Sequence, residues 1–199
     1  MTSKASPCWL PCPTRREFLK TSSTLAGAAV FVTLDLGSAA GAQEASPAAE
    51  PAKDRYTIRG HHLFDMLDAL GTGESKHKTL GPVARQIRAN PKLPIQVVIG
   101  EDDICAPCQW WDHAKALCKK SLDKHPDDNA NSLTSDTNAI RVLGLKPGES
   151  RQAAQLYRLI QAKVTRKVFA EEVCVACRLV NKCQETYEAK LAAAVKALS

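Results

Sequence analysis

The chain has 199 residues, of which 27 are Lys or Arg and 21 are Asp or Glu, so its formal net charge is +6. This length suits one domain with an additional segment. The basic residues are scattered rather than grouped in a stripe, which argues against a protein that binds nucleic acid. Eight cysteines in a chain of this size direct attention to thiol or metal chemistry.

The first 42 residues have the layout of a secretory signal. Residues 14–20 read T-R-R-E-F-L-K, an apolar stretch follows at residues 25–36, and Ala40-Gly41-Ala42 fits an A-x-A cleavage site. The arginine pair resembles the twin-arginine consensus, which implies export of an already folded protein by the twin-arginine translocase. The apolar stretch is shorter than the roughly 20 residues that span a bilayer, so we expect no stable membrane span.

Cleavage after residue 42 would remove Cys8 and Cys12 and leave six cysteines. The signal holds four Lys or Arg and two Asp or Glu, so its removal lowers the formal charge from +6 to +4. Residues 43–53 are rich in Ala, Pro and Glu, which predicts a disordered tether. We therefore expect a twin-arginine signal peptide at 1–42, a tether at 43–53 and a single cysteine-rich domain at 54–199, located in the periplasm or otherwise exported.

The predicted elements begin with β-prone runs at residues 56–58 and 95–99, which we expect to pair in a small sheet. Helices are predicted, in chain order, at residues 61–70, 83–89, 109–120, 135–143, 150–164 and 166–198. Gly144 predicts the end of one helix, and Pro147-Gly148 predicts the turn into the next. The pattern predicts a predominantly helical α+β fold, with a two-stranded sheet, about five helices and a cysteine-rich metal or disulfide site.

Two cysteine clusters dominate the predicted domain. Each is a C-x-x-C pair followed by a third cysteine: Cys105, Cys108 and Cys118 in the first, and Cys174, Cys177 and Cys183 in the second. Two thiolates three residues apart can bind one ion, because a turn or helix start brings both sulfurs to the same side. We expect the six cysteines to converge on one cofactor site, with the two C-x-x-C pairs as metal ligands.

Three interpretations of these cysteines stay open. An iron–sulfur cluster is favoured because thiolates are its standard ligands, and folded export suits a cofactor that is inserted before transport. Structural zinc uses the same cysteine spacing. Disulfides suit an oxidising compartment and would need no cofactor. Against them, a bridge within a C-x-x-C pair closes a very short loop and gains little chain entropy.

His61 and His62 open a predicted helix directly after Gly60. Asp65 lies four residues after His61 and therefore on the same face of that helix. These three side chains are further candidate metal ligands. The alternative for the two histidines is a structural role, in which hydrogen bonds within the fold satisfy their rings.

The other polar residues near the first C-x-x-C pair carry weaker signals. His77 and His125 lie in polar loops, where we expect them to be solvated, and His113 is a weak ligand candidate between two cysteines of the first cluster. The E-D-D run at residues 101–103 is expected to cap the turn that presents the C-x-x-C pair. Trp110-Trp111 is expected either to shield a cluster from water or to pack in the core.

Four motifs in the chain have a familiar order. They are R-G-H-H-L-F at residues 59–64, G-E-D-D-I-C-A-P-C at 100–108, V-L-G-L-K-P-G-E at 142–149 and C-V-A-C-x5-C at 174–183. Together they resemble domain-of-unknown-function family 1284, a family of small prokaryotic proteins suspected of binding iron–sulfur. The resemblance spans residues 56–185, nearly the whole predicted domain. It implies an iron–sulfur cofactor and no established reaction.

These observations predict an exported iron–sulfur-binding protein that serves electron transfer or redox sensing and works with a redox partner protein. The alternative is a zinc- or disulfide-stabilised periplasmic binding module without redox activity. An enzyme that uses His61, His62 and Asp65 has the least support, because the chain has no nucleotide-binding loop, no G-x-S-x-G elbow and no H-E-x-x-H motif. We therefore do not expect an enzyme by itself, and no catalytic residue is assigned.

Overall fold

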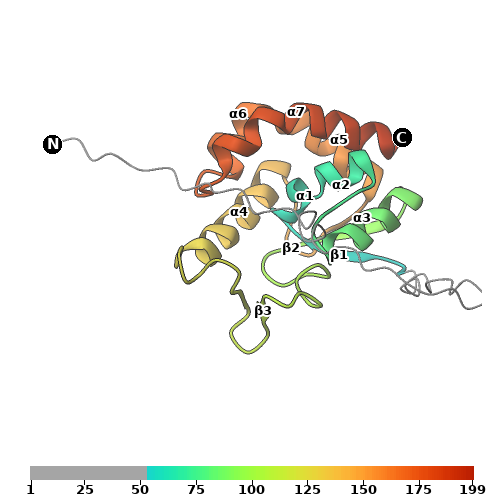
Figure 1. The fold of residues 1–199 in the computed structure, drawn as a ribbon. Helices are drawn as coiled ribbons and strands as arrows, with labels where there is room; N and C mark the ends of the chain where they lie inside the picture. The colour runs from blue at the N-terminus through green and yellow to red at the C-terminus, as the bar shows by residue number, and fades with distance from the viewer. Residues whose placement is uncertain (1–52) are drawn as a thin grey trace, which may run out of the picture. The chain divides into compact units, whose positions relative to one another are not determined.

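Strands β1 (Tyr56–Arg59), β2 (Pro94–Val98) and β5 (Ser150–Gln152) form a sheet in the order β1-β2-β5 (Figure 1). The structure is a computed structural model that describes residues 53–199. The predicted signal peptide and nearly all of the predicted tether lie outside the described residues. β1 runs parallel to β2, and β5 runs antiparallel to β2. The predicted pairing of the first two strands is therefore confirmed, and the sheet has a third strand.

The third strand takes up residues that the sequence pattern assigned to the start of a helix. The N–H of Gly148 donates to the carbonyl of Val97 over 2.7 Å, and the N–H of Val97 donates to the carbonyl of Glu149 over 2.9 Å. These bonds hold the chain extended beside β2 until Gln152, so the predicted helix 150–164 begins only at Ala153. Local periodicity could not detect a strand of three residues whose paired residues lie 54 to 58 positions away.

Together with this sheet, the helices make the fold a mixed α+β fold, as expected. They are α1 (His62–Asp65), α2 (Leu67–Thr72), α3 (Leu80–Ala89), α4 (Asp128–Leu143), α5 (Ala153–Lys163), α6 (Arg166–Val168), the π-helix η1 (Phe169–Val173) and α7 (Val180–Ala197). The helices α5, α6 and α7 gather on one side of the described domain, and α7 packs against α2 (Figure 1). No helix among the described residues is long and apolar enough to span a membrane.

The prediction of one long helix over residues 166–198 is wrong, because the chain unwinds in its middle. The N–H of Cys174 bonds the carbonyl of Phe169 over 2.9 Å, five residues back, which widens the last turn into a π-helix. Residues 174–179 then form turns, and α7 begins at Val180. Single π-helical turns inside helices are often found at functional sites, and here the interruption carries the second C-x-x-C pair.

The predicted helix at residues 109–120 is also wrong. This segment is a hairpin of β3 (Trp111–Asp112) and β4 (Leu117–Cys118). The Asp112 carboxylate accepts the N–H groups of Ala114 and Lys115, both over 3.2 Å, and so stabilises a turn in place of a helix. The hairpin turns the third cysteine of the first cluster, Cys118, back toward the domain.

Helix α4 brings a polar residue into the core. It begins at Asp128, before the predicted start at residue 135, and ends at Leu143. The capping residue Gly144 has a left-handed φ of 69°, which confirms the predicted C-terminal glycine. Gly60 lies against this helix, because a β-carbon there would come within 2.5 Å of the Asp136 carbonyl oxygen. The junction of β1 and α1 can therefore approach α4 closely only with glycine at this position.

Candidate metal centre

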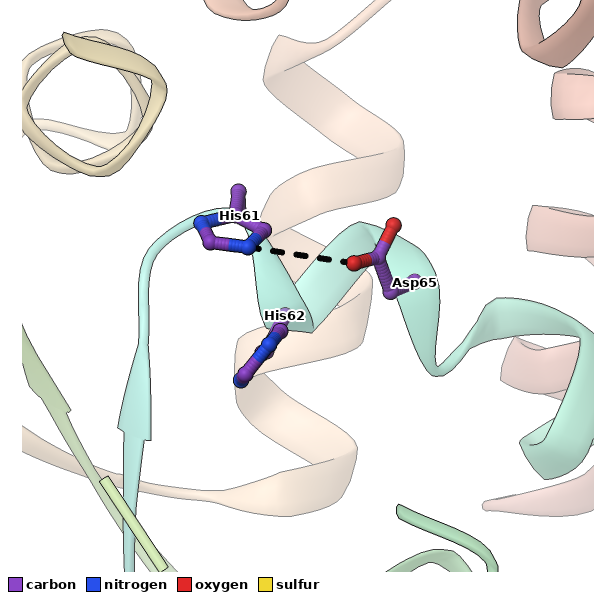
Figure 2. A group of neighbouring side chains, drawn as sticks. All are labelled: His61, His62 and Asp65. Carbon is purple, nitrogen blue, oxygen red and sulfur yellow. Dashed lines mark ion pairs between the residues drawn. The ribbon is translucent and has the colours of Figure 1, made fainter. Parts of the chain in front are cut away.

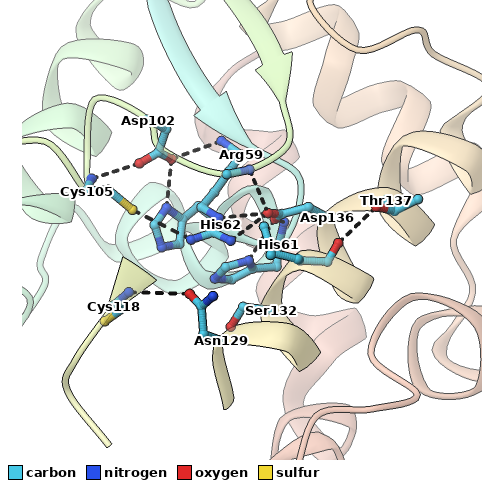
Figure 3. A network of polar contacts seen from close by, with 12 residues as sticks. Arg59, His61, His62, Asp102, Cys105, Cys118, Asn129, Ser132, Asp136 and Thr137 are labelled. Carbon is cyan, nitrogen blue, oxygen red and sulfur yellow. Dashed lines mark hydrogen bonds and ion pairs between the residues drawn. The ribbon is translucent and has the colours of Figure 1, made fainter. Parts of the chain in front are cut away.

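Asp136 of α4 is a fully buried carboxylate at the centre of a polar network (Figure 3). Its Oδ2 accepts a hydrogen bond of 2.8 Å from Nε of Arg59 at the end of β1. Nη2 of Arg59 lies 2.7 Å from the same oxygen, and this contact is an ion pair without hydrogen-bond alignment. Oδ1 of Asp136 contacts both the backbone N–H of His61, at 2.9 Å, and its ring Nδ1, at 2.8 Å.

The charge state of Asp136 follows from these contacts. Burial acts to raise the pKa of Asp136, but the hydrogen bonds from His61 and Arg59, together with the charge of Arg59, outweigh it and hold the pKa below its ordinary value. The carboxylate is therefore ionised at neutral pH. It fixes both the arginine and the orientation of the first histidine.

Asp102 fixes the orientation of the second histidine, His62, as Asp136 fixes that of His61. Its Oδ2 lies 2.7 Å from Nδ1 of His62 and accepts the backbone N–H of Arg59 over 2.9 Å. Its Oδ1 accepts the N–H groups of Ile104 and Cys105, over 3.0 and 2.8 Å. These last two bonds confirm that the E-D-D run caps the turn before the first C-x-x-C pair. Burial opposes ionisation of Asp102, yet the bonds from His62 and the backbone lower its pKa to about 2.

The pKa of Asp102 predicts how acid changes stability. A carboxyl with a lowered folded-state pKa contributes stability that is complete above its unfolded value of 3.8 and is lost as the pH falls through about 2. We expect Asp102→Asn to lower the free energy of unfolding at pH 6. Between pH 5 and pH 2 the free energy of unfolding should then fall further in both proteins, by about 2 kcal/mol less in the variant than in the wild type. Urea unfolding with a chelator present measures both, and parallel pH curves would contradict the assignment.

The two imidazole rings therefore share one geometry (Figures 2 and 3). Each Nδ1 faces a buried carboxylate, and the ring centroids of His61 and His62 lie 4.5 Å apart. Nε2 of His61 lies 3.9 Å from Oδ2 of Asp65. One ring nitrogen of each histidine and one Asp65 oxygen lie within 4.8 Å of one another. The carboxylate behind each ring selects the tautomer that carries its proton on Nδ1 and leaves Nε2 as the metal-binding atom.

A small cavity of about 90 Å³ lies beside these histidines. It is bordered by all three cysteines of the first cluster, together with His61, His62, His77 and Trp111. Sγ of Cys105 lies 3.8 Å from Nη1 of Arg59, and burial raises the pKa of this thiol to about 12. The indole N–H of Trp111 is buried and has no hydrogen-bond partner within residues 53–199. Trp111 is therefore a buried residue of the cavity wall that carries an unused donor.

A larger cavity of about 480 Å³ contains the second cluster. Four cysteines line it: Cys118, Cys174, Cys177 and Cys183. His61 and Asp65 are also on its wall, and His61 and Cys118 border both cavities. The two cysteine clusters are therefore neighbours that share Cys118, although their two C-x-x-C pairs border different cavities. All six cysteines of the described domain are free thiols.

The thiol spacing separates the candidate cofactors. Within residues 53–199, no three cysteine sulfurs lie within 4.8 Å of one another.

Two cysteines of the larger cavity hold their protons. Burial raises the pKa of Cys174, and neighbouring Cys177 and Asp65 raise it further. Burial, followed by Asp65, also raises the pKa of Cys183. The free thiols of these two residues are therefore protonated at neutral pH and become thiolates only when a metal replaces the proton.

The other three histidines differ in exposure, and one of them differs from the prediction. The prediction of a solvated His77 is wrong, because its side chain is half-buried on the wall of the small cavity and its Nδ1 accepts the N–H of Leu80 over 3.2 Å. His125 is exposed, as predicted. His113 is exposed, lies 3.1 Å from Glu101 and borders neither cavity.

Two central residues escaped sequence reasoning. Arg59 and Asp136 belong to no spaced motif of ligand residues. The sequence nevertheless carries a signal for Asp136, because it lies three, four and seven residues before Ala139, Ile140 and Leu143 and so on the apolar face of its helix. A carboxylate on an apolar face predicts a buried partner.

The fold and site define a class: a small α+β domain in which two histidines, each held by a buried carboxylate, adjoin two cavities walled by six thiols. The family model described as "Protein of unknown function (DUF1284)" matches residues 75–183, and the chain belongs to this family. The match contains all six cysteines of the described domain and begins after His61 and His62. No curated protein and no solved structure matches the chain.

Proposed function

We propose that the chain is an exported iron–sulfur protein whose cluster serves electron transfer or redox sensing. The observation that carries the proposal is one cavity of about 480 Å³ lined by four thiols: Cys118, Cys174, Cys177 and Cys183. Four cysteine thiolates are the common ligand set of [2Fe–2S] and [4Fe–4S] clusters. This set replaces the two C-x-x-C pairs as the proposed ligands, because Cys105 and Cys108 border the smaller cavity.

The spacing of the thiols favours a polynuclear cluster over a single zinc ion. Tetrahedral zinc with Zn–S bonds of about 2.3 Å sets its sulfur ligands about 3.8 Å apart. No three sulfurs of the described domain are within 4.8 Å of one another, whereas a cluster of several irons holds its ligands on different metal ions. The four-thiol donor set of the larger cavity therefore supports an iron–sulfur group.

The surrounding residues suit a redox site. Phe64 and Phe169 supply an aromatic wall of the larger cavity, and their rings lie 5.5 Å apart. Leu179 and Cys183 on the same cavity are exposed. When bound, an iron–sulfur group supplies one-electron transfer. The apolar wall would exclude water from one side, while the exposed edge would give a redox partner protein access to the other.

Metal content and colour test this proposal. The full chain, expressed with its N-terminal segment in cells that assemble clusters and purified without oxygen, should contain iron and sulfide in equal amounts and absorb broadly in the visible range. A colourless protein without iron would overturn the proposal. Zinc would then favour the zinc-stabilised binding module, and the absence of free thiols in denaturant would favour the disulfide-stabilised one.

A further inference from the structure

We propose that His61, His62 and Asp65 form a mononuclear site for a divalent transition metal beside the thiols of the larger cavity, with Fe²⁺ as the metal that its ligand set suits. Two imidazoles and one carboxylate on one side of a metal leave other coordination positions open, an arrangement typical of non-haem Fe²⁺ sites. This site uses none of the six cysteines. The inference therefore does not depend on the iron–sulfur proposal.

The first support is the buried carboxylate that faces Nδ1 of each histidine. Metal-binding histidines commonly donate the second ring nitrogen to a carboxylate, which fixes the tautomer and raises the basicity of the ligand nitrogen. Here both histidines have such a partner: Asp136 lies 2.8 Å from Nδ1 of His61, and Asp102 lies 2.7 Å from Nδ1 of His62. Both carboxylates are fully buried, so the two ring orientations are set before any metal arrives.

The second support is the balance of charge. Arg59 compensates Asp136, but Asp102 and Asp65 form no ion pair with Lys or Arg among residues 53–199. A buried carboxylate without a cation is costly. Among residues 53–199, the only basic side chain in ion-pair contact with Asp102 is the ring of His62. A metal ion on Nε2 of His62 would supply positive charge to both carboxylates.

The third support is that one ring nitrogen of each histidine and one Asp65 oxygen lie within 4.8 Å of one another. Metal–nitrogen and metal–oxygen bonds of about 2.0–2.2 Å place neighbouring ligands about 3–3.5 Å apart. Nε2 of His61 and Oδ2 of Asp65 are 3.9 Å apart across one turn of helix. The rings of His61 and His62 are largely covered, whereas the Asp65 side chain is 58% exposed. Asp65 can therefore rotate inward to close the site, and an ion can enter from its side.

Cobalt(II) provides the probe, because its visible spectrum distinguishes nitrogen and oxygen ligands from thiolates. The titration uses the full chain carrying Cys174→Ser and Cys177→Ser, which removes two of the competing thiols. We expect one equivalent of cobalt to bind with visible d–d bands and without a thiolate charge-transfer band. Adding Asp65→Asn or His62→Gln should weaken binding at least tenfold. Asp68→Asn and His125→Gln are matched controls on exposed residues and should leave the affinity unchanged.

The outcomes separate this site from the cluster site. Absent cobalt binding, a thiolate charge-transfer band from the first equivalent of cobalt, or a first-site affinity that neither Asp65→Asn nor His62→Gln changes would each overturn the mononuclear site. Asp65→Asn keeps an exposed side chain of the same size, so loss of folding cannot explain its effect. Iron and sulfide measured on the Asp65→Asn chain should equal those of the wild type. Their absence from both chains would refute the cluster alone.

Discussion

Serine replacement of any one cysteine of the larger cavity should abolish stable binding of iron and sulfide. The four variants are Cys118→Ser, Cys174→Ser, Cys177→Ser and Cys183→Ser. Each variant removes one of the four proposed thiolate ligands. Loss of a residue that only hydrogen-bonds to a metal ligand already lowers metal affinity about 10- to 100-fold, and loss of a ligand is a larger change. Iron, sulfide and visible absorbance measured on anaerobically purified full chains provide the readout.

The first C-x-x-C pair supplies the matched controls for this series. Cys105→Ser and Cys108→Ser should retain iron and sulfide, because these thiols border the smaller cavity. The hydroxyl of a serine at residue 105 can still accept a hydrogen bond from Arg59, so we expect that variant to fold. If Cys105→Ser and Cys108→Ser lose the cluster while Cys118→Ser and Cys183→Ser keep it, the ligands are the two C-x-x-C pairs and our assignment is wrong.

Asp136→Asn should lower the free energy of unfolding by about 3–5 kcal/mol, because it leaves Arg59 with a buried charge and no anionic partner. Both side chains of this ion pair are almost completely buried, at 2% and 0% exposure. The same carboxylate also accepts bonds from His61 and from the N–H of Gly100, so the junction of β1, α1 and α4 loses several contacts at once. Urea unfolding gives the difference from the shift in midpoint at constant m-value.

Asp128→Asn is the control for this prediction, because it changes the same residue type on the same helix. Asp128 pairs with Arg178 over 3.2 Å at a partly exposed position, and such pairs contribute about 0–1 kcal/mol. We expect a correspondingly small loss. If the two variants prove equally stable, the buried network does not hold the domain together as described.

The sequence alone determined the features that depend on local pattern. The pairing of β1 with β2 followed from two short β-prone runs, and the end of α4 followed from Gly144. The third strand and the hairpin at residues 111–118 did not follow. Their hydrogen bonds form only when the partner segment is present, as Val97 is for β5, or when a side chain such as Asp112 stabilises a turn.

For the candidate site, the sequence by itself determined which chemistry is available: six thiols in two spaced clusters, and His61 and His62 at a helix start with Asp65 one turn further on. Only the tertiary structure decided how these groups are distributed. It brings Cys118 to the second cluster and sets Asp102 and Asp136 behind the two imidazoles. The reason is physical: cavity walls and buried charge pairs form between segments 40 to 77 positions apart, and no local periodicity records such contacts.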